Sequence, residues 1–122
     1  MIDYSKTAPT CEISVLGTTY KIYLDVPENE DAFLMTCNGY CDKTAKRIVV
    51  VGERAENELD DWSEFRKVCL RHEIIHAFLY ESGLDSNTTW CTDEEEHPEM
   101  VVEWIAVQFP KILKTFKEVG AL

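Results

Sequence analysis

The feature that most constrains this chain is a His-Glu-x-x-His motif, His72-Glu73-Ile74-Ile75-His76, whose flanks predict helix in both directions. On an α-helix the two imidazoles lie one turn apart on one face, about 6 Å along the axis. This separation lets both bind a single tetrahedral Zn²⁺, with Glu73 beside the open coordination position as a general base. We therefore expect His72 and His76 to be ligands of one zinc ion.

The helix around the motif has recognisable ends. Asp61-Trp62-Ser63-Glu64 resembles a capping box with Asp in place of Ser or Thr, so the helix is expected to start near Asp60 or Asp61. Gly83 predicts its C-terminal end. Apolar residues at helical spacing predict one buried stripe that contains both histidines: Trp62, Phe65, Val68, Cys69, Ile75 and Leu79. Two hydrogen-bonded core histidines are the alternative, but the spacing and the intervening glutamate favour a metal.

The length of 122 residues predicts a single domain, expected over residues 11–122 after a flexible N-terminal arm at residues 1–10. No apolar run approaches the 18 or more residues of a membrane span. The first six residues have neither the basic start nor the apolar core of a signal peptide, which favours a cytoplasmic protein.

The formal charge of −11 argues against nucleic acid or an anionic membrane as a partner. The acidic run Asp93-Glu94-Glu95-Glu96 predicts a solvated loop or, alternatively, a patch that selects a basic substrate or partner. Five cysteines, an odd number without a secretion signal, indicate reduced thiols. Cys37 and Cys41 are close enough to leave a second metal site or a local disulfide open.

Strand patterns precede the motif helix. Residues 11–16 and 20–25 alternate apolar and polar around Gly17-Thr18, which predicts a β-hairpin. The β-branched run at residues 47–51 predicts a third strand, and Asn38-Gly39 before it predicts a turn. We therefore expect an α+β fold, a small three-stranded sheet packed on the motif helix and a second helix that bears glutamates.

That second helix supplies candidates for the third zinc ligand. His97-Pro98-Glu99 predicts its start, and Pro110 predicts a stop or a kink. Glu103 stands in an almost wholly apolar helix, where an unpaired carboxylate would cost several kcal/mol to desolvate. Glu99 lies one turn earlier on the same face.

Docking that face on the two histidines predicts Glu99 as the third ligand. Glu103 would then accept the other ring N–H of a ligand histidine. Alternatively, Glu99 merely favours the helix N-terminus and Glu103 pairs with a lysine. His97, the remaining histidine, is a further candidate ligand.

His72-Glu73-Ile74-Ile75-His76, followed by Glu99-Met100-Val101-Val102-Glu103, resembles the gluzincin zinc metallopeptidases, in which a glutamate on a later helix completes the zinc site. The chain length, the strands before the motif helix and the short loop between the helices are similar to the minimal forms, the minigluzincins. Residues 76–84 and 99–106 also resemble small phage-encoded proteins related to the ImmA/IrrE-type metallopeptidase-like proteins. The resemblance covers roughly residues 11–110.

The motif and the resemblance together imply a zinc-dependent metallopeptidase of narrow specificity, from a phage or a bacterium. Zinc would make its water acidic and polarise the scissile carbonyl, while Glu73 moves the water's proton to the leaving amine. A peptide or protein substrate is expected to add to an edge strand around Ile48 to Val51. Tyr80 and Tyr40 are candidates for a contact to the oxyanion or the substrate.

Two functions of other classes remain open. One is a zinc-stabilised regulatory or protein-binding module with little or no turnover, and the other is a zinc-independent helical interaction domain. Glu73 favours the peptidase, because a purely structural zinc site needs only ligands.

Overall fold

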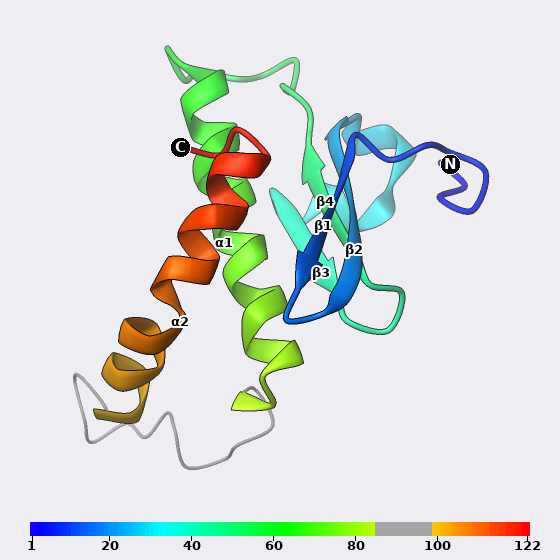
Figure 1. The fold of residues 1–122 in the computed structure, drawn as a ribbon. Helices are drawn as coiled ribbons and strands as arrows, with labels where there is room; N and C mark the ends of the chain where they lie inside the picture. The colour runs from blue at the N-terminus through cyan, green and yellow to red at the C-terminus, as the bar shows by residue number, and fades with distance from the viewer. Residues whose placement is uncertain (85–98) are drawn as a thin grey trace.

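The computed structural model describes residues 1–84 and 99–122, and for residues 99–103 and 106 it describes the backbone alone. In chain order the elements are β1 (Cys11–Val15), β2 (Thr18–Val26), β3 (Gly39–Asp42), β4 (Arg47–Val51), α1 (Trp62–Glu81) and α2 (Glu99–Glu118). Two short 3-10 helices, Glu28–Glu30 and Ala32–Met35, lie between β2 and β3. The strands form one sheet in the order β1-β2-β4-β3, with β2 and β4 parallel and the other neighbours antiparallel (Figure 1). The fold is of the α+β class, as expected.

The sequence predicts three strands, and the structure adds a fourth, β3. The Asn38-Gly39 pair predicts a turn, yet Gly39 is the first residue of β3 and is paired with Val50. The turn lies instead at residues 43–46, so β3 and β4 form an antiparallel hairpin. β4 lies between β2 and β3, and the expectation of an edge strand at residues 48–51 is therefore wrong. Its unbroken apolar run fits a strand that is buried on both faces.

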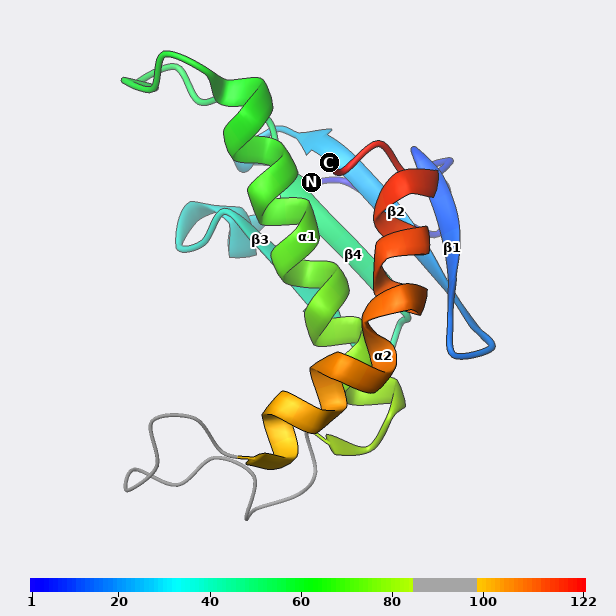
Figure 2. The same cartoon turned by 60° about the vertical axis from the view of Figure 1, so that its left-hand side comes forward.

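The helices and the N-terminal segment cover opposite faces of the sheet (Figures 1 and 2). α1 and the C-terminal half of α2 pack on one face, in a buried cluster that includes Ile48, Ile74 and Phe116. The second cluster lies on the other face, where Val49 packs with Leu34 of the second short helix. The sheet is therefore the middle layer of the fold.

The first ten residues, expected to form a flexible arm, lie against the face of the sheet opposite α1. The Tyr4 and Tyr23 rings meet edge to face with their centroids 4.7 Å apart. The backbone N–H of Ile2 donates to the carbonyl of Glu30 at 2.8 Å. The Tyr4 hydroxyl donates to Asp31, a carboxylate that is only 6% exposed. These contacts make the segment part of the packed domain.

Both ends of α1 lie where the sequence predicts them. Asp61 is the N-cap, and its carboxylate accepts a hydrogen bond from the backbone N–H of Glu64 at 3.0 Å. Ser82 caps the other end, and Gly83 follows with φ of 80°, a left-handed conformation that suits glycine. Local capping chemistry therefore sets the length of the helix that carries the motif.

The face of α1 that points into the core is not the predicted one. The residues that the helix buries are Leu70, Glu73, Ile74, Ala77 and Phe78. Val68 and Ile75, which belong to the predicted stripe, are 48% and 40% exposed. His72 is exposed and His76 is half-buried. The helix has two apolar faces, and the one without histidines packs on the sheet.

The described part of α2 runs from Glu99 through Pro110 to Glu118 and changes direction along its length (Figure 2). Its C-terminal half reaches the core through Ile112 and Phe116. In the N-terminal half, Ile105 is 47% exposed. Among the described residues, no helix combines the length and the apolar character that crossing a membrane requires.

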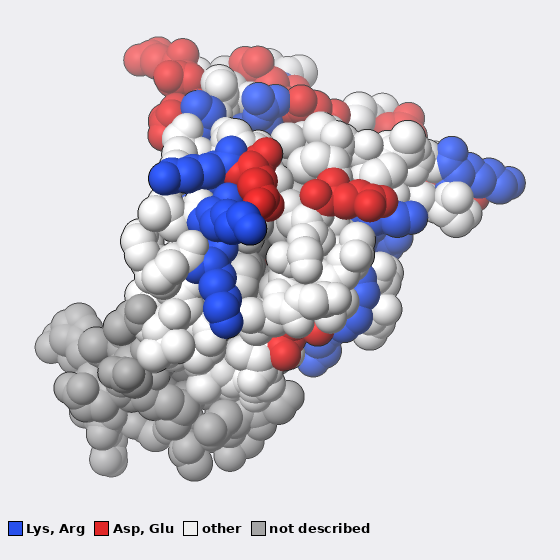
Figure 3. All heavy atoms as spheres, viewed as in Figure 1, with Lys and Arg blue, Asp and Glu red and all other residues white. Residues whose placement is uncertain are grey.

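Charge is unevenly distributed over the surface (Figure 3). Acidic side chains gather over the loop that precedes α1, and basic side chains gather over the C-terminal half of α2. The sequence places six carboxylates and one arginine between Glu53 and Glu64. Among the residues that the structure describes, negative charge is therefore concentrated beside the start of the motif helix.

Glu81, the last residue of α1, connects the helix to the sheet. Its carboxylate accepts hydrogen bonds from Lys46 Nζ at 2.7 Å, the Tyr20 hydroxyl at 2.7 Å and Thr18 Oγ1 at 3.0 Å. The hydrogen bonds from Lys46 and then Tyr20 lower the pKa of this carboxyl. Its side chain is only 14% exposed, so solvent screens these contacts little.

We expect Glu81→Gln to lower the free energy of unfolding by about 1.5–3 kcal/mol at pH 7. A carboxyl whose pKa is lower in the folded state stabilises the fold above its unfolded pKa, about 4.3, and loses this effect as the pH falls through the folded pKa. The difference between the variant and the parent should therefore disappear in acid. Urea denaturation at several pH values measures it.

Glu118→Gln is the matched control, because Glu118 is the last residue of α2 and is exposed. Lys114 Nζ lies 3.9 Å from its carboxylate, and such exposed pairs contribute less than about 0.5 kcal/mol. Equal losses in the two variants would contradict the role of Glu81.

Candidate metal centre

The two motif histidines converge on one point beside α1. Their Nε2 atoms are 3.1 Å apart and their ring centroids 4.8 Å apart. Two nitrogens bound tetrahedrally at 2.0–2.1 Å from one zinc ion would be about 3.3 Å apart. The helix therefore presents His72 and His76 in an arrangement that fits two ligands of one zinc ion.

Glu73 completes this cluster from the buried side of the helix. The ligand atoms of His72, Glu73 and His76 all lie within 4.8 Å of one another, and this is the one potential metal-binding group among the residues whose positions are described. Glu73 is 6% exposed. Burial raises the pKa of its carboxyl, and the charge of His72 opposes that rise. A carboxylate with a raised pKa is a better proton acceptor near neutral pH.

Gly39 lets β3 approach Glu73 closely. A Cβ atom at this position would lie 3.5 Å from Glu73 Cγ and 2.9 Å from the backbone oxygen of Val49. The second distance is a steric clash with the neighbouring strand, so the pairing of β3 with β4 requires glycine here. Sequence reasoning missed this residue because Asn38-Gly39 also fits a turn. The signal that could have revealed the strand is weak, because only Tyr40, Cys41 and Asp42 separate the glycine from the turn at residues 43–46.

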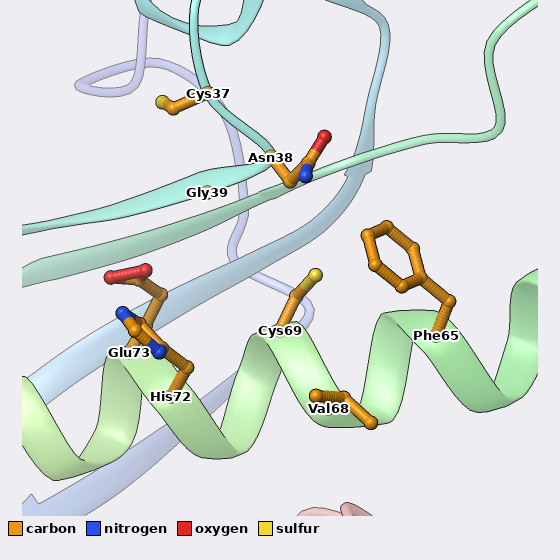
Figure 4. Close-up of a pocket in the computed structure, with 8 residues that line it drawn as sticks. All are labelled: Cys37, Asn38, Gly39, Phe65, Val68, Cys69, His72 and Glu73. Atoms are coloured by element: carbon orange, nitrogen blue, oxygen red, sulfur yellow. The ribbon is translucent and has the colours of Figure 1, made fainter.

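A cavity of about 340 Å³ opens beside the cluster, between α1 and the start of β3 (Figure 4). The α1 residues Phe65, Val68 and Cys69 line it together with His72 and Glu73. The segment before and at the start of β3 contributes the remaining lining residues, Cys37, Asn38 and Gly39. In Figure 4, the His72 and Glu73 side chains lie at one end of this group and Phe65 at the other. The candidate centre is therefore open to a ligand on one side.

The two tyrosines proposed for the site lie on different faces of the sheet. The Tyr80 ring stacks on His76, with centroids 6.1 Å apart and an interplanar angle of 23°. Lys43 Nζ lies 5.1 Å from the centre of the Tyr80 ring. Tyr40 instead donates its hydroxyl to Asp31, on the face of the sheet opposite α1. The structure therefore brings Tyr80 to the cluster and places Tyr40 away from it.

The proposed third ligand lies on a helix whose backbone alone is described at that point. Glu99 is the first residue of α2, and Glu103 follows one turn later. Their side chains, His97 and the acidic run at residues 93–96 lie outside the described residues. The assignments of Glu99 as ligand and Glu103 as its partner therefore remain predictions.

Cys37 and Cys41 do not pair with each other. Both are free thiols, and Cys37 Sγ donates to the carbonyl of Phe33. Cys41 packs against the core on the α1 face, where burial raises its pKa to about 12. The two thiols therefore form neither the local disulfide nor, among the described residues, the second metal group that the sequence left open.

A scan of family models and searches of curated proteins and solved structures find no match to this chain.

Proposed function

We propose that this protein is a zinc-dependent metallopeptidase. The observation that carries the proposal is the buried Glu73 carboxylate beside two histidine Nε2 atoms that are 3.1 Å apart, at the end of an open cavity. A structural zinc site has no use for a buried carboxylate that is not needed as a ligand. A hydrolytic site needs one as a base.

In this proposal His72, His76 and Glu99 hold one zinc ion, and Glu103 accepts a ring N–H from one of the histidines. When bound, zinc would supply Lewis acidity, which polarises a carbonyl group and makes a water molecule more acidic. Glu73 accepts a proton from the attacking water as the water oxygen bonds to the carbonyl carbon. The C–N bond then breaks, and Glu73 returns the proton to the leaving amine nitrogen.

The edge strand β3 is the proposed binding site for the substrate backbone. Within the described parts of the chain, β3 pairs with β4 on one side only, so its other edge can accept an extended peptide. Antiparallel pairing is the more stable arrangement. A peptide antiparallel to β3 would run from Asp42 toward Gly39, so the residues after the scissile bond would lie near Phe65. Tyr80, beside His76, is the candidate for a contact to the oxyanion.

The experiment that tests this proposal combines metal analysis with a peptide-cleavage assay. We expect the protein to bind one equivalent of zinc. The zinc-bound protein should cleave members of a diverse peptide mixture, and mass spectrometry detects the products. A chelator should abolish cleavage, and added zinc should restore it, because the proposed reaction requires the Lewis acidity of the metal.

The main alternative is a zinc-stabilised protein-binding module, and the exposed apolar side chains of Val68 and Ile75 beside the histidines favour it. One bound zinc without cleavage of any peptide would support this module and refute the peptidase. Absence of zinc binding would refute both.

A further inference from the structure

The cavity at the metal centre continues into a second one. The second cavity, of about 290 Å³, lies farther toward the N-terminus of α1 and extends to the segment at residues 56–59. Asn38 and Phe65 line both cavities. We call the two together the α1 groove, which runs from Glu73 past Phe65 to Glu58.

The end of the α1 groove nearest the metal centre is apolar. Phe65, Val68 and Cys69 supply its wall on α1, and in Figure 4 they follow one another along the helix from His72. Val68 is 48% exposed although it is aliphatic. Apart from His72 and Glu73, the polar side chain that lines this cavity within the described part of the chain belongs to Asn38. This end suits an apolar side chain.

The far end of the α1 groove is acidic. Glu56 and Glu58 line it, and both are exposed. Arg54 also lines it, but its guanidinium is hydrogen-bonded to other groups. It donates to the Glu28 carboxylate, to Asn38 Oδ1 and to two backbone carbonyls, each at 2.7–2.9 Å. Arg54 therefore does not neutralise Glu56 and Glu58, and Figure 3 shows acidic side chains gathered over this loop.

The dimensions set the spacing that a peptide must have. Seven residues separate Phe65 from His72, about 10 Å along the helix axis. An extended peptide covers that length in about three residues. A side chain at the first or second position after the scissile bond would lie near Val68. One at the fourth or fifth position would reach Glu56 and Glu58.

We propose that the α1 groove selects peptides with an apolar residue directly after the scissile bond and lysine or arginine three to four residues farther on. This inference rests on the proposed peptidase function and names its substrate class. Charge complementarity favours basic peptides, because the carboxylates at the far end of the α1 groove attract a cationic side chain and repel an acidic one.

The test uses the full-length, zinc-loaded Glu73→Gln variant, so that binding is measured without turnover. Two fluorescein-labelled decapeptides share a central Ala-Leu pair, and they differ only in having two lysines or two glutamates at the fourth and fifth positions after the Ala-Leu bond. We expect the lysine peptide to bind about tenfold more tightly at low salt, and 0.5 M NaCl to reduce this preference. Fluorescence anisotropy gives both affinities.

Charge reversal in Glu56→Lys/Glu58→Lys, on the same background, should invert the preference. Glu12→Lys is the matched control, because Glu12 is exposed on β1 and lies outside the groove. Val68→Asp should weaken binding of both peptides several-fold, because it places a charge against the leucine. Equal affinity for the two peptides, or an equal effect of the control, would overturn the proposal.

The outcome also separates this proposal from the peptidase on which it rests. A preference for lysine in binding, without cleavage by the parent protein, would refute the peptidase and leave the groove supported. Cleavage of both peptides at equal rates, with equal binding, would refute the groove alone.

Discussion

We expect Glu73→Gln to keep a full equivalent of zinc and to lose peptide hydrolysis by a factor of about 10²–10⁴, the usual contribution of a general base. Glutamine has the shape of glutamate but cannot accept the proton of the attacking water. Its amide would fill the same space against Gly39. Because burying a neutral amide costs less than burying a carboxylate, the metal-free variant should be no less stable than the parent.

Glu64→Gln is the control, because Glu64 is an exposed glutamate on the same helix. This variant should match the parent in zinc content, measured by mass spectrometry, in cleavage rate and in stability to urea. If Glu73→Gln kept hydrolysis within tenfold of the parent, Glu73 would not be the base. If it lost its zinc, Glu73 would be a ligand instead.

The second large effect concerns the ligands themselves. We expect His76→Ala and Glu99→Ala each to weaken zinc binding by more than about 100-fold, because the loss of a direct ligand exceeds the 10–100-fold cost of losing an outer contact. Competition with a chromophoric chelator measures the affinity. Glu103→Gln, which keeps the size of the side chain but removes its charge, should cost about 10-fold.

His97→Ala is the control for this series, because His97 is the third histidine of the chain and is not assigned a zinc ligand. It should bind zinc as the parent does. The opposite pattern, with loss in His97→Ala and none in Glu99→Ala, would move the third ligand to His97 and remove the link to α2.

Local chemistry made the ends of α1 predictable, and non-local packing made its orientation unpredictable. Asp61 and Gly83 end the helix through contacts within a few residues, so both ends can be predicted from the adjacent sequence. The helix has apolar residues on two faces, and periodicity alone does not say which one meets the sheet. The packing of Ile74 and Phe78 against the strands decides this, and it turns Val68 outward.

The candidate site divides in the same way. The convergence of His72 and His76 follows from a spacing of four residues on one helix, and the sequence predicts it. The approach of Gly39 to Glu73 depends on the pairing of β3 with β4 and on the packing of that hairpin under α1. No short-range signal encodes that contact, so the cavity at the edge strand emerged only from the structure.

The hydrogen bonds of Asp31 link the N-terminal segment to β3. The Asp31 carboxylate accepts hydrogen bonds from the hydroxyl groups of both Tyr4 and Tyr40, so it anchors both the opening residues of the chain and the strand that borders the candidate metal centre. Trimming or fusion at residues 1–4 would disturb this shared anchor. Its effect would then pass through Tyr40 to β3, the strand that lines the candidate metal centre on the other face of the sheet.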